Sequence, residues 1–99
     1  MARIELAPEV LDDFDRIFDQ RSTFDADHMA QGIGEIADAV QILEHSSRIG
    51  RPVMRGKREL VIGRGSHGYV ALYRFVSAID TVFVLAVRNQ RESGYKHPG

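Results

Sequence analysis

The pattern of hydrophobic and polar residues predicts strands near both ends of the chain. Ile4 and Leu6 alternate with charged residues, which predicts a short strand over residues 3–6 with one buried face. Three β-rich runs in the second half predict strands over residues 58–63, 69–76 and 81–87. The links between these three strands are short enough for hairpins. We therefore expect the last three strands to form an antiparallel meander.

Two amphipathic helices are predicted between the first and second strands. Pro8 suits the first turn of the first helix, where a missing N–H is not needed. The apolar residues of this helix are Val10, Leu11, Phe14, Ile17 and Phe18, and Asp13 is assigned to its polar side. The second helix has apolar residues at Met29, Ile33, Ile36, Val40 and Leu43. Ser22, Thr23 or Asp25 could cap it.

Two glycines interrupt the second helix. Gly32 and Gly34 weaken it by roughly 1 kcal/mol each relative to alanine if both are interior. They could instead allow a close approach between the two helices.

The order of these elements predicts an α+β fold, β-αα-βββ, with a helical hairpin packed on one face of a small, mainly antiparallel sheet. Residues 45–57 lack periodicity and contain Gly50, Pro52 and Gly56, so they are predicted as a loop. Two helices should return the chain to the end where the first strand finished. On that reasoning the first strand is antiparallel to the second and fourth strands, and parallel to the third if it pairs there. We expect one domain over residues 1–99.

Charge divides the chain into two unlike halves. Residues 1–46 carry 11 acidic and three basic side chains, a balance of -8, and the rest carries 10 basic and three acidic ones, a balance of +7. An acidic helical layer and a basic sheet layer could attract each other within the fold. Alternatively, the basic layer could meet a nucleic acid or an acidic peptide. Because the seven excess positive charges are scattered, strong autonomous nucleic-acid binding is not expected, and an acidic protein segment is at least as good a partner.

Several chemistries are not expected from this sequence. It has no cysteine, so it offers no disulfide or thiol chemistry, and its start reads neither as a signal peptide nor as a membrane span. We expect a soluble cytoplasmic protein with no metal and no cofactor. The four histidines lack the spacing of a helical metal motif: His28, His45, His67 and His97. The glycine-rich run "GRGSHG" leads into a strand rather than a helix, so a hairpin is preferred over a phosphate loop.

Strand ends could bring several cationic residues and a tyrosine onto one surface: Arg58, Arg74, Arg88, Arg91 and Tyr95. Arginines suit the dianionic transition state of phosphodiester cleavage, and a histidine or a perturbed tyrosine could move the proton. Against catalysis, Arg74 could pair with Glu59 across a hairpin, and Tyr69 and Tyr73 alternate like packing residues. For Arg88 and Arg91 we favour contact with a partner over a solvated strand end, and both over catalysis.

Five segments spread over nearly the whole chain carry a family resemblance: "IELAPEVLDDFDRIFD", "ILEHSSRIGRPV", "RELVIG", "GYVALYRF" and "VFVLAVRNQRESGY". With them the chain resembles the RelE/ParE toxin superfamily of bacterial type II toxin-antitoxin modules. That resemblance implies the same β-αα-βββ arrangement.

The two branches of this superfamily imply different mechanisms. RelE-like members cut messenger RNA on the ribosome with lysines on the second strand, an arginine early in the third, and an arginine and a tyrosine near the C-terminus. Arg91 and Tyr95 approximately match the last two, with a different spacing. The lysine positions fall near Glu59 and Val61, and the third-strand arginine position is Val70. Because glutamate and valine cannot neutralise a phosphate, the resemblance favours the ParE-like branch, which poisons DNA gyrase without a recognised hydrolytic site.

The resemblance therefore implies a toxin of the plasmid-stabilisation type that forms a hetero-oligomer with a cognate antitoxin. The antitoxin would wrap an acidic C-terminal segment around the toxin, and DNA gyrase is the expected target. We expect a binding protein rather than an enzyme, with no catalytic residues. The residues expected to bind partners are Arg58, Arg74, Arg88, Arg91 and Tyr95.

Two alternatives stay open. One is a ribosome-dependent messenger RNA endoribonuclease, which would use Arg74, Arg91, Tyr95 and His67. The other is a non-toxic family member that only binds an antitoxin. On the favoured hypothesis, the tail after residue 87 is a basic recognition edge that continues the last strand.

Overall fold

The computed structural model describes residues 1–18, 26–63 and 68–96, and among them it confirms the α+β fold. The strands are β1 Arg3–Leu6, β2 Arg51–Pro52, β3 Arg58–Ile62, β4 Tyr69–Val76 and β5 Thr81–Asn89. The helices are α1 Glu9–Ile17 and α2 Ala26–Gln41, with the short 3₁₀ helices η2 Ile42–Glu44, η3 Met54–Gly56 and η5 Ser77–Ile79. Pro8 lies just before α1, as the helix N-cap. The predicted caps of the second helix lie outside the described residues.

Strand direction is where the predicted topology is wrong. The sheet order is β1-β5-β4-β3-β2, and β1 pairs parallel to β5, with Arg3 opposite Thr81. The remaining pairs are antiparallel, so β1, β3 and β5 all run in one direction.

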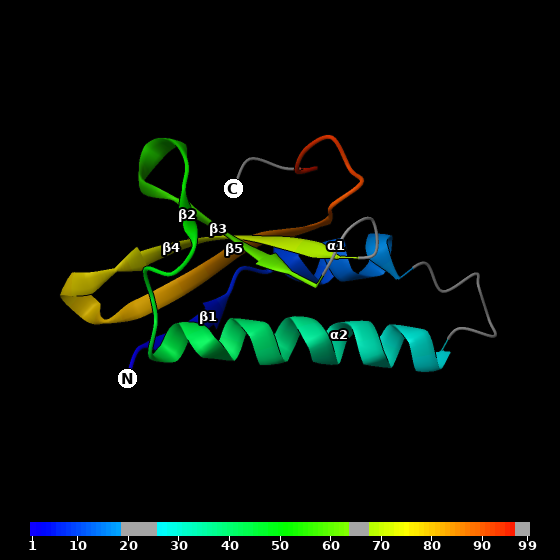
Figure 1. Cartoon of the computed structure of the whole chain (residues 1–99), viewed down its shortest axis with the longest axis horizontal. Coiled ribbons are helices and arrows are strands. Elements are labelled where there is room, and N and C mark those ends of the chain that lie inside the picture. Colours follow the sequence, from blue (N-terminus) through cyan, green and yellow to red (C-terminus); the bar gives the residue numbers. More distant parts are fainter. Residues whose placement is uncertain (19–25, 64–67, 97–99) are drawn as a thin grey trace.

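The unequal lengths of the two helices explain this direction. In Figure 1, α1 continues beyond the end of β1, and the longer α2 runs back past it. Nine residues of α1 span about 14 Å and sixteen residues of α2 span about 24 Å, so the return overshoots. The N–H of Ala2 donates to the carbonyl of Glu44 at 2.8 Å, which places the end of η2 beside the start of β1. The chain therefore re-enters the sheet from the end where β1 began.

The segment predicted as a loop over residues 45–57 contains the fifth strand. β2 places Arg51 opposite Glu59 and Pro52 opposite Arg58 at the edge of the sheet. An edge strand tolerates proline because its outward N–H has no ladder partner to lose. Two residues are too few to show an alternating pattern, which is why the sequence did not indicate this strand.

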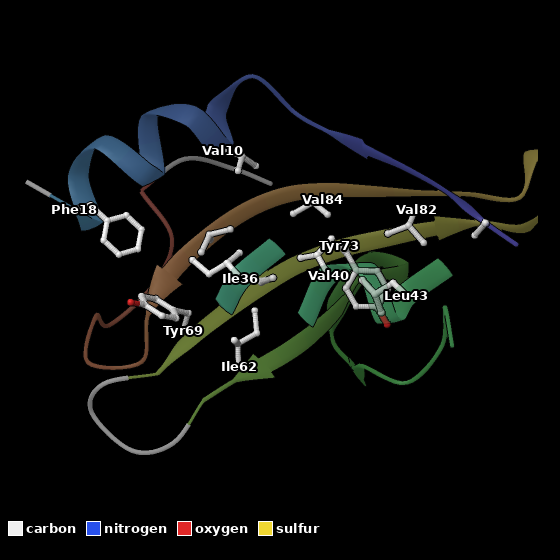
Figure 2. Packing of buried hydrophobic residues seen from close by; sticks show 13 residues of the cluster. Val10, Phe18, Ile36, Val40, Leu43, Ile62, Tyr69, Tyr73, Val82 and Val84 are labelled. Carbon is white, nitrogen blue, oxygen red and sulfur yellow. The ribbon is translucent and has the colours of Figure 1, made fainter. Parts of the chain in front are cut away.

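The main core lies between the helices and the sheet. Figure 2 shows apolar side chains from α1, α2 and the long strands gathered there, including Val10, Ile36, Val40 and Val84. Tyr69 and Tyr73 are buried in this core, as their alternation predicted. By contrast, Leu6 and Leu11 are 52% and 62% exposed, because β1 is an edge strand and Leu11 lies outside the buried stripe of α1.

Gly32 allows a close approach of α2 to Phe18 at the end of α1, as considered from the sequence, and also to Tyr69 on β4. A Cβ atom at Gly32 would lie 2.4 Å from Cε1 of Phe18 and 2.7 Å from the hydroxyl oxygen of Tyr69. A Cβ atom at Gly34 would meet open space. The absence of a side chain at Gly32 thus lets α2 pack directly against two aromatic rings.

The other face of the sheet carries a smaller buried layer. Val70, Leu72 and Ala86 are buried although they alternate with the residues that face the helices. Figure 1 shows η3 and the segment 90–96 on the side of the sheet opposite α2. β5 ends at Asn89 and the chain then turns, so the tail does not continue the last strand, and that part of the interpretation is wrong. After β5, the N–H of Glu92 donates to the carbonyl of Asn89 at 3.2 Å as the chain turns back.

Candidate functional site

A buried carboxylate lies on the face of the sheet opposite α1 and α2, which we call the helix-free face. Glu59 on β3 is buried, and its Oε2 accepts the hydroxyl of Tyr95 at 2.7 Å. Its Oε1 forms an ion pair with Nη2 of Arg51 on β2. Arg88 on β5 places its guanidinium 5.3 Å from the centre of the Tyr95 ring. We call Arg51, Glu59, Arg88 and Tyr95 the Glu59 cluster.

The cluster keeps Glu59 ionised and Tyr95 protonated. Burial would raise the pKa of Glu59, but the hydrogen bonds from Arg51 and Tyr95 and the charges of Arg51 and Arg88 outweigh it, so the pKa lies below its usual value. Burial and then the Glu59 carboxylate raise the pKa of Tyr95 well above its ordinary range. At neutral pH the phenol is therefore a hydrogen-bond donor that holds its proton, which makes it a poor general base.

Arg88 is occupied by the C-terminal segment rather than exposed to solvent. Its Nη1 donates to the carbonyls of Glu92 at 2.9 Å and Asn89 at 3.1 Å. Its Nε is buried without a hydrogen-bond partner among the described residues. The side chain predicted to contact a partner thus supports the segment 90–96 against the sheet.

Helix α1 holds the same segment from the other side. Arg16 donates from Nε and Nη2 to the two carboxylate oxygens of Glu92, at 3.0 and 3.2 Å. Its Nη1 pairs with Asp13 at 2.6 Å, and Asp13 is itself 1% exposed. We call Asp13, Arg16 and Glu92 the Arg16 clasp. Burial would lower the pKa of Arg16, but Asp13 and Glu92 outweigh it, so that pKa is raised. Burial would raise the pKa of Glu92, but its pairing with Arg16 and the N–H of Asn89 outweigh it, so that pKa is lowered.

The clasp also satisfies backbone groups of β5. The pairing of β1 with β5 ends at Val84, so Val87 has no strand neighbour on that side. Instead, Asp13 Oδ2 accepts the N–H of Val87 at 2.9 Å, and Arg16 donates to its carbonyl at 3.2 Å. Two side chains of α1 therefore replace a strand where β1 stops.

The other predicted residues lie apart from this cluster. Arg58 is on the helix side of β3, where it donates to the carbonyls of Arg48 and Gly50 at 3.0 and 2.9 Å. Arg74 is exposed and donates to the carbonyl of Arg55 at 3.0 Å. It does not pair with Glu59, because Leu72 is the residue opposite Glu59 and Arg51 and Tyr95 occupy the carboxylate.

Arg91 and His67 complete the predicted set. Arg91 is exposed beyond β5 and makes no hydrogen bond or ion pair with another described residue. His67 lies outside the described residues. The structure thus brings Arg88 and Tyr95 together and leaves Arg58, Arg74 and Arg91 separate.

Neither a metal site nor a membrane span is found in the part of the chain that the structure describes. Within residues 1–18, 26–63 and 68–96, no three histidine, aspartate or glutamate side chains are grouped to hold a metal ion. No described helix combines the length and hydrophobicity needed to cross a bilayer.

Comparison with protein families decides the family of this chain. The family of the ParE toxin of the type II toxin-antitoxin system parDE matches residues 4–94. The chain belongs to the ParE toxin family. A comparison with curated protein sequences found no match.

Two solved structures share the fold of this ParE-family chain. The chromosomal ParDE system from P. aeruginosa aligns at a TM-score of 0.72 and 19% identity, covering 90% of this chain and 96% of that one. The intact E. coli RelBE toxin-antitoxin complex aligns at 0.61 and 15% identity, covering 93% and 100%. At these identities the likeness establishes the fold alone.

Sequence reasoning missed the Arg16 clasp, although one signal for it was present. Asp13 lies three residues after Val10 and four before Ile17, so it falls within the apolar stripe of α1 rather than on its polar side. A charged residue in an apolar stripe indicates a buried ion pair, here with Arg16. Arg51 gave no comparable signal, because its partner Glu59 becomes its neighbour only through β2.

Proposed function

We propose that this ParE-family chain is a toxin that inhibits DNA gyrase and is neutralised by a cognate antitoxin with an acidic C-terminal segment. The observation that carries the proposal is the hydrogen bond from the Tyr95 hydroxyl to Glu59. A nuclease site on this face would need cations around a scissile phosphate, whereas the face holds the ionised carboxylate of Glu59.

Three further observations support a binding function over RNA cleavage. Val70 stands at the expected arginine position and is buried. Arg88 is tied to the backbone of the C-terminal segment, so it is not placed to hold a phosphate. Because the pKa of Tyr95 is raised, its hydroxyl keeps the proton that a general base would have to release before it could act.

Partner binding is assigned to the exposed arginines at the rim of this face. Arg74 and Arg91 are exposed, whereas Arg58, Arg88 and Tyr95 are largely used in internal contacts. For the antitoxin we propose Arg91, an exposed cation of the basic half of the chain that lies in the C-terminal segment.

The target is tested with purified protein in two assays run side by side. Gyrase supercoiling should be inhibited, and messenger RNA on translating ribosomes should stay intact. Cleaved RNA with unaffected gyrase would establish the endoribonuclease alternative instead. If both substrates are unaffected, the chain is a non-toxic antitoxin-binding member of the family.

Antitoxin binding is tested by reversing one charge. Arg91→Glu should weaken the complex with the antitoxin encoded next to this gene and make its affinity less sensitive to salt. Arg3→Glu is the matched control, because Arg3 is exposed on β1 and pairs with the exposed Glu5. Arg88→Glu is unsuitable, since it would release the C-terminal segment. Equal affinity of the Arg91 variant and the wild type at every salt concentration would place the contact elsewhere.

A further inference from the structure

A tight hairpin projects from the sheet next to the helix-free face. It joins β2 to β3 through η3, and it is closed by the N–H of Val53 donating to the carbonyl of Lys57 at 2.9 Å. Figure 1 shows this hairpin rising on the side of the sheet opposite α2. We call Met54, Arg55 and Gly56 the hairpin tip.

The hairpin tip has an unusual backbone that a neighbouring side chain supports. Arg55 has φ 63 and ψ 36, and Gly56 follows with φ 73. A left-handed conformation is ordinary for glycine but unfavourable for arginine, so the surrounding structure must maintain it. Arg74 contributes by donating from Nη2 to the carbonyl of Arg55 at 3.0 Å. An exposed arginine of β4 thus fixes the shape of the tip.

The tip presents an apolar side chain within basic surroundings. Met54 is 81% exposed, more than any other large hydrophobic residue described. The chain has no aspartate or glutamate between Glu44 and Glu59, but it has five basic residues there: Arg48, Arg51, Arg55, Lys57 and Arg58. Glu59 is the nearest following carboxylate, and Arg51 and Tyr95 already occupy it.

We propose that the hairpin tip docks on the protein target of this toxin, at an acidic surface with an apolar recess that accepts Met54. Flexible, polarisable methionine side chains suit such recesses on protein partners. Arg51 is paired with Glu59 and Arg58 makes internal contacts, so the exposed Arg55 is the tip cation that complements carboxylates at the rim of the recess. A nucleic-acid ligand fits less well, because the highly exposed Met54 is apolar and the tip offers no aromatic ring on which a base could stack.

This inference rests on the proposed function, because it takes gyrase as the protein that provides the acidic surface. The test measures binding of purified gyrase to four variants of the full chain. Met54→Gln keeps the length of the side chain but removes its apolar character. Arg55→Asn removes the charge and suits the backbone, because asparagine adopts positive φ more readily than most residues. The matched controls are Leu11→Gln and Arg3→Gln, which alter an exposed leucine on α1 and an exposed arginine on β1.

Both tip variants should bind gyrase roughly tenfold or more weakly and inhibit supercoiling correspondingly less, while the controls behave as wild type. Unchanged melting temperatures would show that the variants are folded. Wild-type affinity in both tip variants would overturn the inference while leaving the proposed function intact. Binding to duplex DNA that is lost with Arg55→Asn but kept with Met54→Gln would overturn it in favour of a nucleic acid. If the wild-type chain itself neither binds nor inhibits gyrase, the proposed function fails first and this inference fails with it.

Discussion

Tyr95→Phe isolates the hydrogen bond that closes the helix-free face. The substitution removes the hydroxyl that donates to Glu59 at 2.7 Å but keeps the ring beneath the guanidinium of Arg88. A hydrogen bond to a charged group contributes about 1.5–3 kcal/mol to stability. Because Glu59 keeps its ion pair with Arg51, we expect the lower end, a loss of about 1.5 kcal/mol. For a domain of this size that loss lowers the melting temperature by about 6 to 12 °C.

Urea unfolding at neutral pH measures this loss, with Glu59→Gln and the double variant completing a thermodynamic cycle. The wild type and the variants should share one m-value, and the coupling between the two positions should exceed about 0.5 kcal/mol. A coupling smaller than this would refute the reasoning, because the hydroxyl and the carboxylate would then act independently.

A second check is alkaline titration. The raised pKa of folded Tyr95 means that its contribution is complete below about pH 10 and is lost as pH rises toward the folded value, a loss that Tyr95→Phe removes.

Three further predictions concern the rest of the chain. Folding lowers the pKa values of Glu59 and Glu92, so the stability that they contribute is present above their unfolded value near 4.5 and is lost as pH falls through the folded values. Urea unfolding at decreasing pH should show this loss. Glutamine at both positions should make the free energy of unfolding depend less on pH. Arg16→Met removes the ion pairs that Arg16 makes with the buried Asp13 and with Glu92, which should cost about 2 kcal/mol in urea unfolding and make the chain after residue 89 susceptible to limited proteolysis. In thermal melts, Gly32→Ala should destabilise the protein by about 1–2 kcal/mol, because its Cβ would overlap the ring of Phe18 and the hydroxyl of Tyr69, whereas Gly34→Ala should be neutral or stabilising.

The fold was predictable where an element is long enough to repeat its pattern. Apolar residues at helical steps located α2, and β-rich runs located β3, β4 and β5. The two-residue strand β2 has no repeat to detect. The direction of β1 depends on how far each helix runs, and helix ends are what a periodic pattern defines least well.

The site was predictable only in part, because its contacts join residues far apart in the chain. Arg88 and Tyr95 were identified from their residue types, and the structure does bring them together. Their relation to Glu59 was not predictable, since Tyr95 reaches it only after the chain turns back over the sheet. The ion pair between Glu59 and Arg51 depends in turn on β2, which the pattern does not show.

The position of Glu59 determines where on this surface the chain can bind a partner. An ionised carboxylate under a closed segment makes this part of the face unsuitable for a phosphate, and it already holds Arg51 in an ion pair and Tyr95 in a hydrogen bond. Outside the Glu59 cluster, the exposed cationic groups of this face lie at the rim, at Arg74 and Arg91, and at the hairpin tip. Removing the carboxylate should therefore loosen the C-terminal segment without creating a nuclease, because Val70 would still occupy the position where a cation is required. Glu59→Gln assayed on ribosomes tests this step, and RNA cleavage by that variant would contradict it.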